Sequence, residues 1–267
     1  MGKKHICKKN QWKVGYRSYK CYKRLDFVIP VNLLAQARKG IQTKITFMKI
    51  KFLIYRYNSQ KKEKLKYDSF DVPYNKGMTV LDVITYIYKH LDSTLAFRYE
   101  CRQGICGTCG VMLNKKPVLS CSTQIDQTLE TQTIEPLANF PVEKDLIVNL
   151  EPVLKRYEKI KPYLDKIHKV IITKKKSNES KAFRKCIECG CCIAGAPEIT
   201  QSAKGCMDPM SLVKVARYVT DPRDGLDRKA MAKKNCIDKY SDEIGKKLTL
   251  LCPRGIPIDE AIKLLKK

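Results

Sequence analysis

The stretch Cys101-Arg-Gln-Gly-Ile-Cys106-Gly-Thr-Cys109, followed by Leu119-Ser-Cys121, decides the fold of the first part of this chain. Its spacing, C-x4-C-x2-C with a fourth cysteine further on, is typical of four thiolates that hold a [2Fe–2S] cluster. Glycines between the cysteines supply the permissive backbone that a loop wrapped around a cluster needs. Structural zinc sites usually pair two short C-x2–4-C knuckles, which is a different pattern. The sequence therefore predicts [2Fe–2S] ligands at Cys101, Cys106, Cys109 and Cys121.

A second group of cysteines lies downstream, in Cys186-Ile-Glu-Cys189-Gly-Cys191-Cys192, and a remote Cys252-Pro253 follows. Three thiolates in C-x2-C-x2-C spacing together with a distant Cys-Pro indicate a [4Fe–4S] cluster, with Cys186, Cys189, Cys192 and Cys252 as ligands. Cys191 falls outside the spacing and is interpreted as a packed neighbour. A zinc site is the alternative, because C-x2-C pairs bind zinc too.

The chain resembles the iron–sulfur subunits of succinate dehydrogenase and fumarate reductase (respiratory complex II). The resemblance covers most of the chain, about residues 48–267, in the order of the family. The matching stretches are Arg98–Cys109, Val118–Cys121, Ile134–Leu137, Phe140–Leu146, Cys186–Cys192, Asp221–Asp224 and Cys252–Gly255.

The resemblance implies an α+β fold in two domains. An N-terminal β-grasp, ferredoxin-like [2Fe–2S] domain would span residues 48–150, and an all-α, ferredoxin-like [4Fe–4S] domain would span residues 151–267. The eight cysteines named above match the family's ligands for these two clusters. The implied function is electron transfer between a flavoprotein (FAD) subunit and a membrane or quinone-side acceptor, as part of an oxidoreductase and not as a catalyst alone. The implied location is peripheral, on the mitochondrial matrix face or the bacterial cytoplasmic face of a membrane.

The family usually has a third, [3Fe–4S] cluster, and this chain departs from it there. The three ligand positions hold Ala196, Asp242 and Leu248. Alanine and leucine cannot bind iron, so the [3Fe–4S] cluster is predicted to be absent. Cys206 and Cys236 are off-register, and a rearranged third site that uses them stays open. The aromatic run that helps to form the family's quinone pocket is also missing, which argues against the usual route to quinone.

Composition limits the other functions. The formal net charge is +26, and residues 1–47 contain twelve Lys or Arg and one acid, Asp26. A basic surface suits acidic partners or anionic lipid head groups. No nucleic-acid recognition motif accompanies it, so nucleic acid is not expected as a partner. Residues 1–47 have three open interpretations. Their basic, acid-poor composition is typical of a mitochondrial presequence, and they could also be a docking arm. They could instead be a start-site artefact, because Met48 stands where such subunits commonly begin.

The thirteen cysteines exceed the eight predicted ligands by an odd number. Without a secretory signal this remainder argues against a disulfide framework, and cluster assembly requires a reducing compartment. No apolar run approaches the length of a membrane span, so attachment to a membrane would come from partners.

Hydrophobic periodicity predicts the elements that carry these cysteines. Strands are expected at 49–57, 67–72, 134–136 and 146–149, and helices at 80–91 (capped by Thr79), 151–172, 211–219 and 258–265. Residues 173–180 are expected to be a charged loop.

Two other functions compete with the electron-transfer subunit that the resemblance implies. The chain could be the electron-transfer subunit of another flavin- or thiol-linked reductase. It could also be a largely structural paralogue within a respiratory complex, held together by its metal centres.

Overall fold

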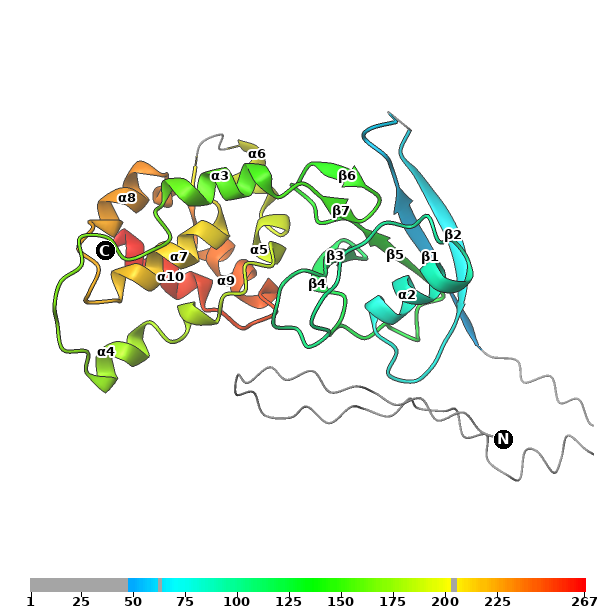
Figure 1. Ribbon diagram of the computed structural model, residues 1–267, viewed down its shortest axis with the longest axis horizontal. Coiled ribbons are helices and arrows are strands. Elements are labelled where there is room, and N and C mark those ends of the chain that lie inside the picture. Colours follow the sequence, from blue (N-terminus) through cyan, green and yellow to red (C-terminus); the bar gives the residue numbers. More distant parts are fainter. Residues whose placement is uncertain (1–47, 62–63, 203–205) are drawn as a thin grey trace, which may run out of the picture. The chain divides into compact units, whose positions relative to one another are not determined.

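The structure is a computed structural model that describes residues 48–61, 64–202 and 206–267. The predicted basic extension, residues 1–47, lies outside the described residues. A five-stranded sheet of order β2-β1-β5-β3-β4 comes first, and helices follow it (Figure 1). The strands are β1 (Lys49–Arg56), β2 (Lys66–Pro73), β3 (Gly110–Leu113), β4 (Lys116–Leu119) and β5 (Thr131–Glu135); β6 (Val142–Lys144) and β7 (Ile147–Val148) form a separate pair. A mixed sheet followed by helices confirms the predicted class.

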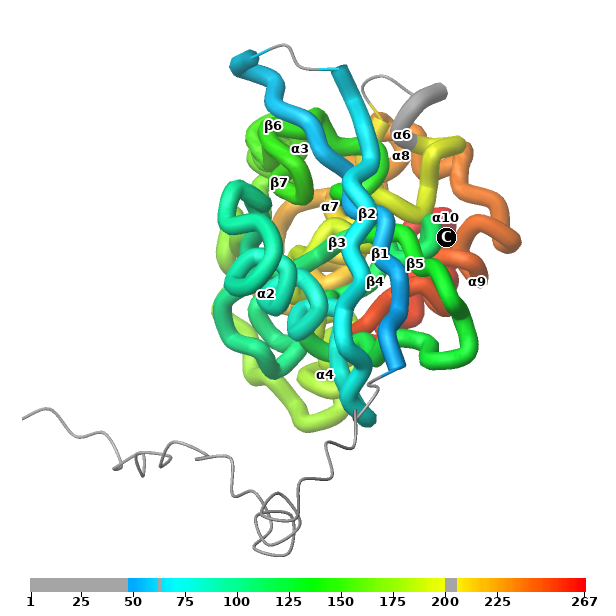
Figure 2. Tube along the Cα trace, turned by 90° about the vertical axis from the view of Figure 1, so that its right-hand side faces the viewer, coloured from blue at the N-terminus to red at the C-terminus, as the bar shows by residue number. Residues whose placement is uncertain are grey.

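β1 forms because its apolar residues recur at every second position. Ile50, Phe52 and Ile54 are buried, and the residues that alternate with them on the other face are exposed or only partly buried. β1 pairs antiparallel with β2, from Lys49 opposite Pro73 to Arg56 opposite Lys66, and parallel with β5 (Figure 2). With one antiparallel and one parallel neighbour at β1, the sheet is mixed and is not a simple meander.

The helix α2 (Val80–His90) begins where the sequence predicts. Thr79 and Asp82 form a capping box, in which each side chain accepts a hydrogen bond from the backbone N–H of the other residue. The helix buries Val83, Ile84 and Ile87 in one core with the sheet. The end of α2 leads into the loop that carries the first three predicted ligands.

The β3–β4 hairpin is buried on both faces. Val111 on β3 packs into the core beneath α2, and its neighbour Met112 packs into the core of the helices. The two-residue turn at Asn114 and Lys115 has positive φ angles of 48° and 64°, which is the backbone that a tight hairpin requires. This hairpin therefore joins the two apolar cores and carries Cys109 and Cys121 at its open end.

Helices make up every named element after Leu150 in the described residues. They are α3 (Glu151–Lys159), α4 (Lys174–Glu179), η1 (Phe183–Lys185), α5 (Cys191–Ala194), α6 (Pro197–Ser202), α7 (Pro209–Val219), α8 (Arg228–Lys234), η2 (Ile237–Lys239), α9 (Asp242–Leu251) and α10 (Ile258–Lys266). The central pair is α7 and α10, whose apolar residues are almost all buried.

Two predicted elements are wrong. The helix expected over 151–172 ends at Lys159, because Pro162 follows within one turn and disfavours helical backbone at the residue before it. Its buried stripe is Val153, Tyr157 and Ile160, whereas Leu154 is half exposed. The charged loop expected over 173–180 contains the short helix α4, which Thr173 caps by accepting a hydrogen bond from Lys176 N–H.

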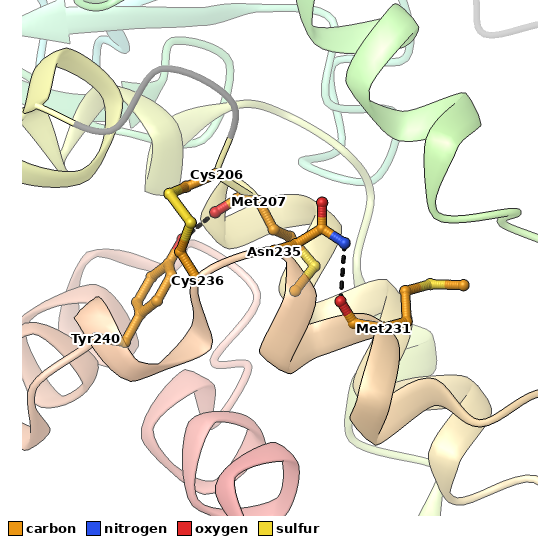
Figure 3. Close-up of a disulfide and its surroundings, with 6 residues drawn as sticks. All are labelled: Cys206, Met207, Met231, Asn235, Cys236 and Tyr240. Carbon is orange, nitrogen blue, oxygen red and sulfur yellow. Dashed lines mark hydrogen bonds between the residues drawn. A yellow bond between two sulfur atoms is a disulfide. The ribbon is translucent and has the colours of Figure 1, made fainter.

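The expectation of unpaired extra cysteines is also wrong for one pair. Cys206 and Cys236, which are separated by 30 residues, are joined in a disulfide with their Cα atoms 5.3 Å apart (Figure 3). A sequence gives no signal for this pair, because it depends on how α7 and α8 pack. While the two sulfurs are bonded to each other, they cannot serve as ligands of a rearranged third cluster.

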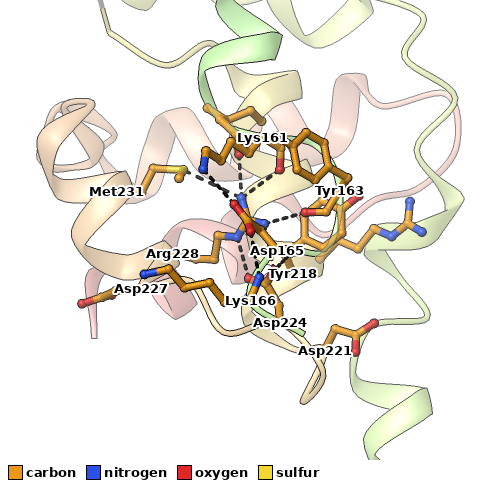
Figure 4. A network of polar contacts seen from close by, with 12 residues as sticks. Lys161, Tyr163, Asp165, Lys166, Tyr218, Asp221, Asp224, Asp227, Arg228 and Met231 are labelled. Carbon is orange, nitrogen blue, oxygen red and sulfur yellow. Dashed lines mark hydrogen bonds and ion pairs between the residues drawn. The ribbon is translucent and has the colours of Figure 1, made fainter. Parts of the chain in front are cut away.

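A buried ion pair fixes the irregular chain after α3. Arg228 and Asp224 are each about 1% exposed, and the guanidinium contacts both carboxylate oxygens, at 2.7 and 2.9 Å (Figure 4). The same guanidinium donates to the backbone carbonyls of Ile160, Lys161 and Tyr163 at 2.6, 3.0 and 2.7 Å. Segment 160–163 therefore has a defined path without being helical.

Candidate iron–sulfur centres

The β3–β4 hairpin brings the four predicted [2Fe–2S] ligands together. Cys101, Cys106 and Cys109 lie in the loop that precedes β3, and Cys121 follows β4. The backbone N–H of Ser120 donates to the carbonyl of Cys109 at 3.0 Å, so the fourth predicted ligand, Cys121, lies near the third, Cys109.

The four sulfurs lie close to one another. Cys101 interacts with Cys106, and Cys121 interacts with both Cys109 and Cys101. A [2Fe–2S] cluster needs four thiolates close together, two on each of two irons, so the four residues fit the cluster. Among the residues that the structure describes, no group of three or more His, Cys, Asp or Glu could hold a single metal ion.

Hydrogen bonds to the sulfurs prepare the site for thiolates. The Thr108 hydroxyl donates to the Cys106 sulfur and lowers the pKa of that thiol to about 7. The backbone N–H of Gln103 donates to the Cys101 sulfur at 3.4 Å. Burial acts in the opposite direction at Cys121 and raises its pKa to about 11. Donors of this kind stabilise the negative charge that a bound cluster carries.

The second predicted site is assembled from two remote segments. Cys186 follows η1, Cys189 and Cys192 lie at the start of α5, and Cys252 follows the last residue of α9. All four line one small cavity, whose other walls are mainly apolar, including Met210, Val213 and Ile256. The residues present therefore fit a buried cluster that connects the two segments.

The thiols of this site differ in their surroundings. Burial raises the pKa of the Cys186 thiol to about 11, and it raises that of Cys192 well above its ordinary value. The pKa of Cys189 is lowered to about 7, because the thiol of Cys191 donates a hydrogen bond to its sulfur. Cys191 lies beside the predicted ligands as the sequence suggests, and its role as a neighbour stays a prediction.

Arg254 connects the two sites. Its Nη1 donates to the carbonyl of Gly104, in the first ligand loop, at 3.4 Å, and its side chain also lines the cavity of the second site. Its Nε atom is buried and has no hydrogen-bond partner among the described residues. A buried N–H of this kind requires an acceptor, and the sulfur of a bound cluster would supply one.

The two ligand loops are in direct contact. A Cβ atom on Gly107 would lie 2.4 Å from the carbonyl oxygen of Ile187 and 3.1 Å from the Cα of Cys189. Gly107 has a φ of +77°, a conformation that glycine adopts without strain. Glycine at this position lets the backbone of one site touch the backbone of the other.

The three positions at which [3Fe–4S] ligands would be expected hold other residues, in different surroundings. Ala196 and Leu248 are fully buried in the core of the helices, where they pack as apolar residues. Asp242 is exposed at the first position of α9, behind the Ser241 cap.

Two functional groups were missed from the sequence. Thr108 lies within the cysteine motif, but a hydroxyl there carries no distinctive signal. Lys214 on α7 forms an ion pair with Glu188, which stands between two predicted ligands and also accepts a hydrogen bond from Tyr157 at 2.9 Å. Lys214 lies outside every stretch that carries the resemblance, so the sequence offered no signal for it.

Comparison with known proteins agrees with this geometry. Residues 51–155 match the family described as a 2Fe-2S iron-sulfur cluster binding domain. The fumarate reductase iron-sulfur subunit of Haemophilus influenzae is 33% identical over 196 residues, which cover 67% of this chain and 76% of that protein. The chain belongs to the family of fumarate reductase and succinate dehydrogenase iron–sulfur subunits.

Other members of the family support the same assignment. The corresponding fumarate reductase subunit of Escherichia coli O157:H7 is 32% identical over 192 residues, which cover 70% of this chain and 78% of that protein. The mitochondrial succinate dehydrogenase [ubiquinone] iron-sulfur subunit of Dictyostelium discoideum is 28% identical over 233 residues, or 81% of each chain.

The fold also agrees with that of a solved structure. A chain of the Mycobacterium smegmatis Sdh1 complex in the apo form superposes with a TM-score of 0.71 at 24% identity, over 82% of this chain and 95% of that one. The chain is thus an iron–sulfur subunit of the succinate dehydrogenase/fumarate reductase type, and it contains a [2Fe–2S] domain. Among the described residues, no helix has the length and apolar character needed to cross a membrane.

Proposed function

We propose that this subunit relays electrons through two clusters, between a flavoprotein (FAD) subunit and an acceptor on the membrane side. In this proposal Cys101, Cys106, Cys109 and Cys121 hold a [2Fe–2S] cluster in domain 48–150. Cys186, Cys189, Cys192 and Cys252 hold a [4Fe–4S] cluster in domain 151–267. The observation that carries the proposal is the convergence of both sets of thiols, at sites whose loops touch through Gly107.

The bound clusters would supply one-electron redox chemistry, and the side chains of this chain adjust it. Thr108 and the backbone N–H groups donate to sulfur, and the Arg254 guanidinium lies between the two sites. Lys214 adds a positive charge near Cys186. The walls of the second site are mainly apolar. No nucleophile or general base is needed, so oxidation of succinate or reduction of fumarate belongs to the flavoprotein.

We further propose that this chain holds no [3Fe–4S] cluster. Two of the three expected ligand positions, Ala196 and Leu248, are packed as core residues without any iron-binding atom. The acceptor must then receive electrons from the [4Fe–4S] side by a route that does not use a third cluster. Membrane anchor subunits or another acceptor would hold the chain peripherally, on the mitochondrial matrix face or the bacterial cytoplasmic face of a membrane.

Electron paramagnetic resonance (EPR) of the anaerobically purified protein tests the cluster content. The oxidised sample should show no signal, because oxidised [2Fe–2S] and [4Fe–4S]²⁺ centres are diamagnetic. Reduction with dithionite should then reveal two centres. A signal from an intact [3Fe–4S] centre in the oxidised sample would contradict the two-cluster proposal, and a single reduced centre would contradict one of the two ligand sets.

Thr108→Val should lower the midpoint potential of the [2Fe–2S] centre by some tens of millivolts. The reduced cluster carries the greater negative charge, so it loses more than the oxidised cluster when the hydroxyl donor is removed. For one electron, about 1.4 kcal/mol corresponds to about 59 mV. Redox titration followed by EPR measures the shift. Thr108→Ser keeps the hydroxyl and serves as the control; an equal shift in both variants would assign the effect to packing.

A further inference from the structure

The Cys206–Cys236 disulfide stands apart from the proposed cluster sites. It joins the segment before α7 to the segment between α8 and η2. Of the nine other cysteines in the described part of the chain, eight are the proposed cluster ligands. Cluster assembly needs these eight thiols reduced, so it requires a reducing environment. In such an environment disulfides are usually transient, and either catalytic or redox-sensing.

The backbone around the pair is held together without the S–S bond. The N–H of Met207 donates to the carbonyl of Asn235 at 3.1 Å, directly beside the two cysteines. The Tyr240 hydroxyl donates to the carbonyl of Met207 at 2.7 Å, and the Tyr240 side chain is completely buried (Figure 3). These contacts would keep the two sulfurs adjacent after the bond opens, so the pair is organised for repeated opening and closing.

The backbone conformation of Cys236 is unfavourable. Cys236 has a φ of +64°, a left-handed conformation that non-glycine residues adopt at a cost of about 1 kcal/mol or more. Such outliers are concentrated at functional sites.

The disulfide is also connected to the second predicted cluster site. Met207 and Tyr240 belong to the apolar core against which Cys192 packs, and Asp208 caps α7, whose Met210 lines the cavity of the second predicted site. Asp208 is two residues from Cys206, and Tyr240 is four residues from Cys236. A short path of peptide and hydrogen bonds, through Met207 and Tyr240, therefore leads from the disulfide to the surroundings of a proposed [4Fe–4S] ligand.

We propose that Cys206 and Cys236 form a two-electron dithiol/disulfide centre that exchanges electrons with the [4Fe–4S] side of the relay. The S–S bond breaks when the pair takes up two electrons, delivered one at a time by an iron–sulfur one-electron donor, and two protons from water. The product is two thiols, and the reverse process forms the bond again. The inference rests on the proposed function, because the electrons must arrive through the chain's own clusters.

The first test counts electrons and thiols in the cluster-loaded protein. The holoprotein is reduced under anaerobic conditions with photoreduced deazaflavin. It is then quenched in acid, and the peptides that contain Cys206 and Cys236 are examined for alkylation by mass spectrometry. The wild-type protein should take up two electrons per chain more than the Cys206→Ser/Cys236→Ser variant, with both cysteines alkylated. The EPR signals of the clusters should be the same in both proteins.

The outcomes separate this inference from the proposed function. If both cluster signals develop fully while the disulfide stays closed, the pair is a structural cross-link and the inference fails alone. If Cys252→Ser, which removes one [4Fe–4S] ligand, opens the disulfide as fast as the wild type does, the electrons do not come through that site. If the wild type shows no clusters, the proposed function itself fails. Alkylation of the wild type decides the matter even if the double variant does not fold.

Discussion

Arg228→Met is expected to lower the free energy of unfolding by about 3–5 kcal/mol, the usual range for breaking a buried ion pair by removing one partner. The substitution leaves the Asp224 carboxylate buried without its charged partner. Among the described residues, the donor that remains is the backbone N–H of Asp165, 3.1 Å from Asp224 Oδ1 (Figure 4). It also removes the donor shared by the carbonyls of Ile160, Lys161 and Tyr163. Anaerobic urea denaturation of the holoprotein, followed by circular dichroism, measures the change.

Two further variants show whether burial is the cause. Arg223→Met removes the neighbouring ion pair with Asp221, in which the arginine side chain is 42% exposed. Exposed ion pairs contribute little to the free energy of unfolding, so this variant should change the unfolding midpoint little. Arg228→Met combined with Asp224→Leu removes both buried charges and should recover part of the loss. An unfolding midpoint for Arg228→Met equal to that of Arg223→Met would mean that the buried pair does not hold this segment.

Cysteine spacing predicts candidate ligands without reference to the fold. Because cluster geometry restricts that spacing, Cys101 and its three partners could be proposed as ligands from the sequence alone. Thr79 and the apolar spacing after it likewise determined the start of α2. Alternation in β1 was visible because only one of its faces is buried.

The elements that were missed depend on contacts between distant segments. Residues of β3 such as Val111 and Met112 face two different cores, so no alternation marks the strand. The path of the chain after Lys159 is fixed by Arg228, which lies nearly seventy residues away. The Cys206–Cys236 disulfide likewise joins two segments that are distant in the sequence. Such long-range contacts leave no local periodicity, so the polar groups around the candidate ligands could not be predicted from the sequence.

Gly107→Ala should have the largest effect on the relay. The new Cβ would lie 2.4 Å from the backbone oxygen of Ile187, which cannot rotate away as a side chain could, so one ligand loop must move away from the other. Overpacking of this kind costs about 1–3 kcal/mol, and the positive φ adds strain of about 1 kcal/mol or more. Transfer of electrons between the two clusters should become slower, and the magnetic coupling between the two reduced centres should weaken.

Gly77→Ala is the matched control for this prediction. Gly77 has a φ of +82°, close to that of Gly107, but a Cβ atom there would meet nothing within 4 Å. It therefore introduces the backbone strain without the clash between loops. We expect Gly77→Ala to destabilise the protein modestly and to leave the coupling between the reduced centres unchanged. If both variants kept the wild-type coupling, the contact at Gly107 would not set the separation of the clusters; if both weakened it, backbone strain and not the contact between the loops would be responsible.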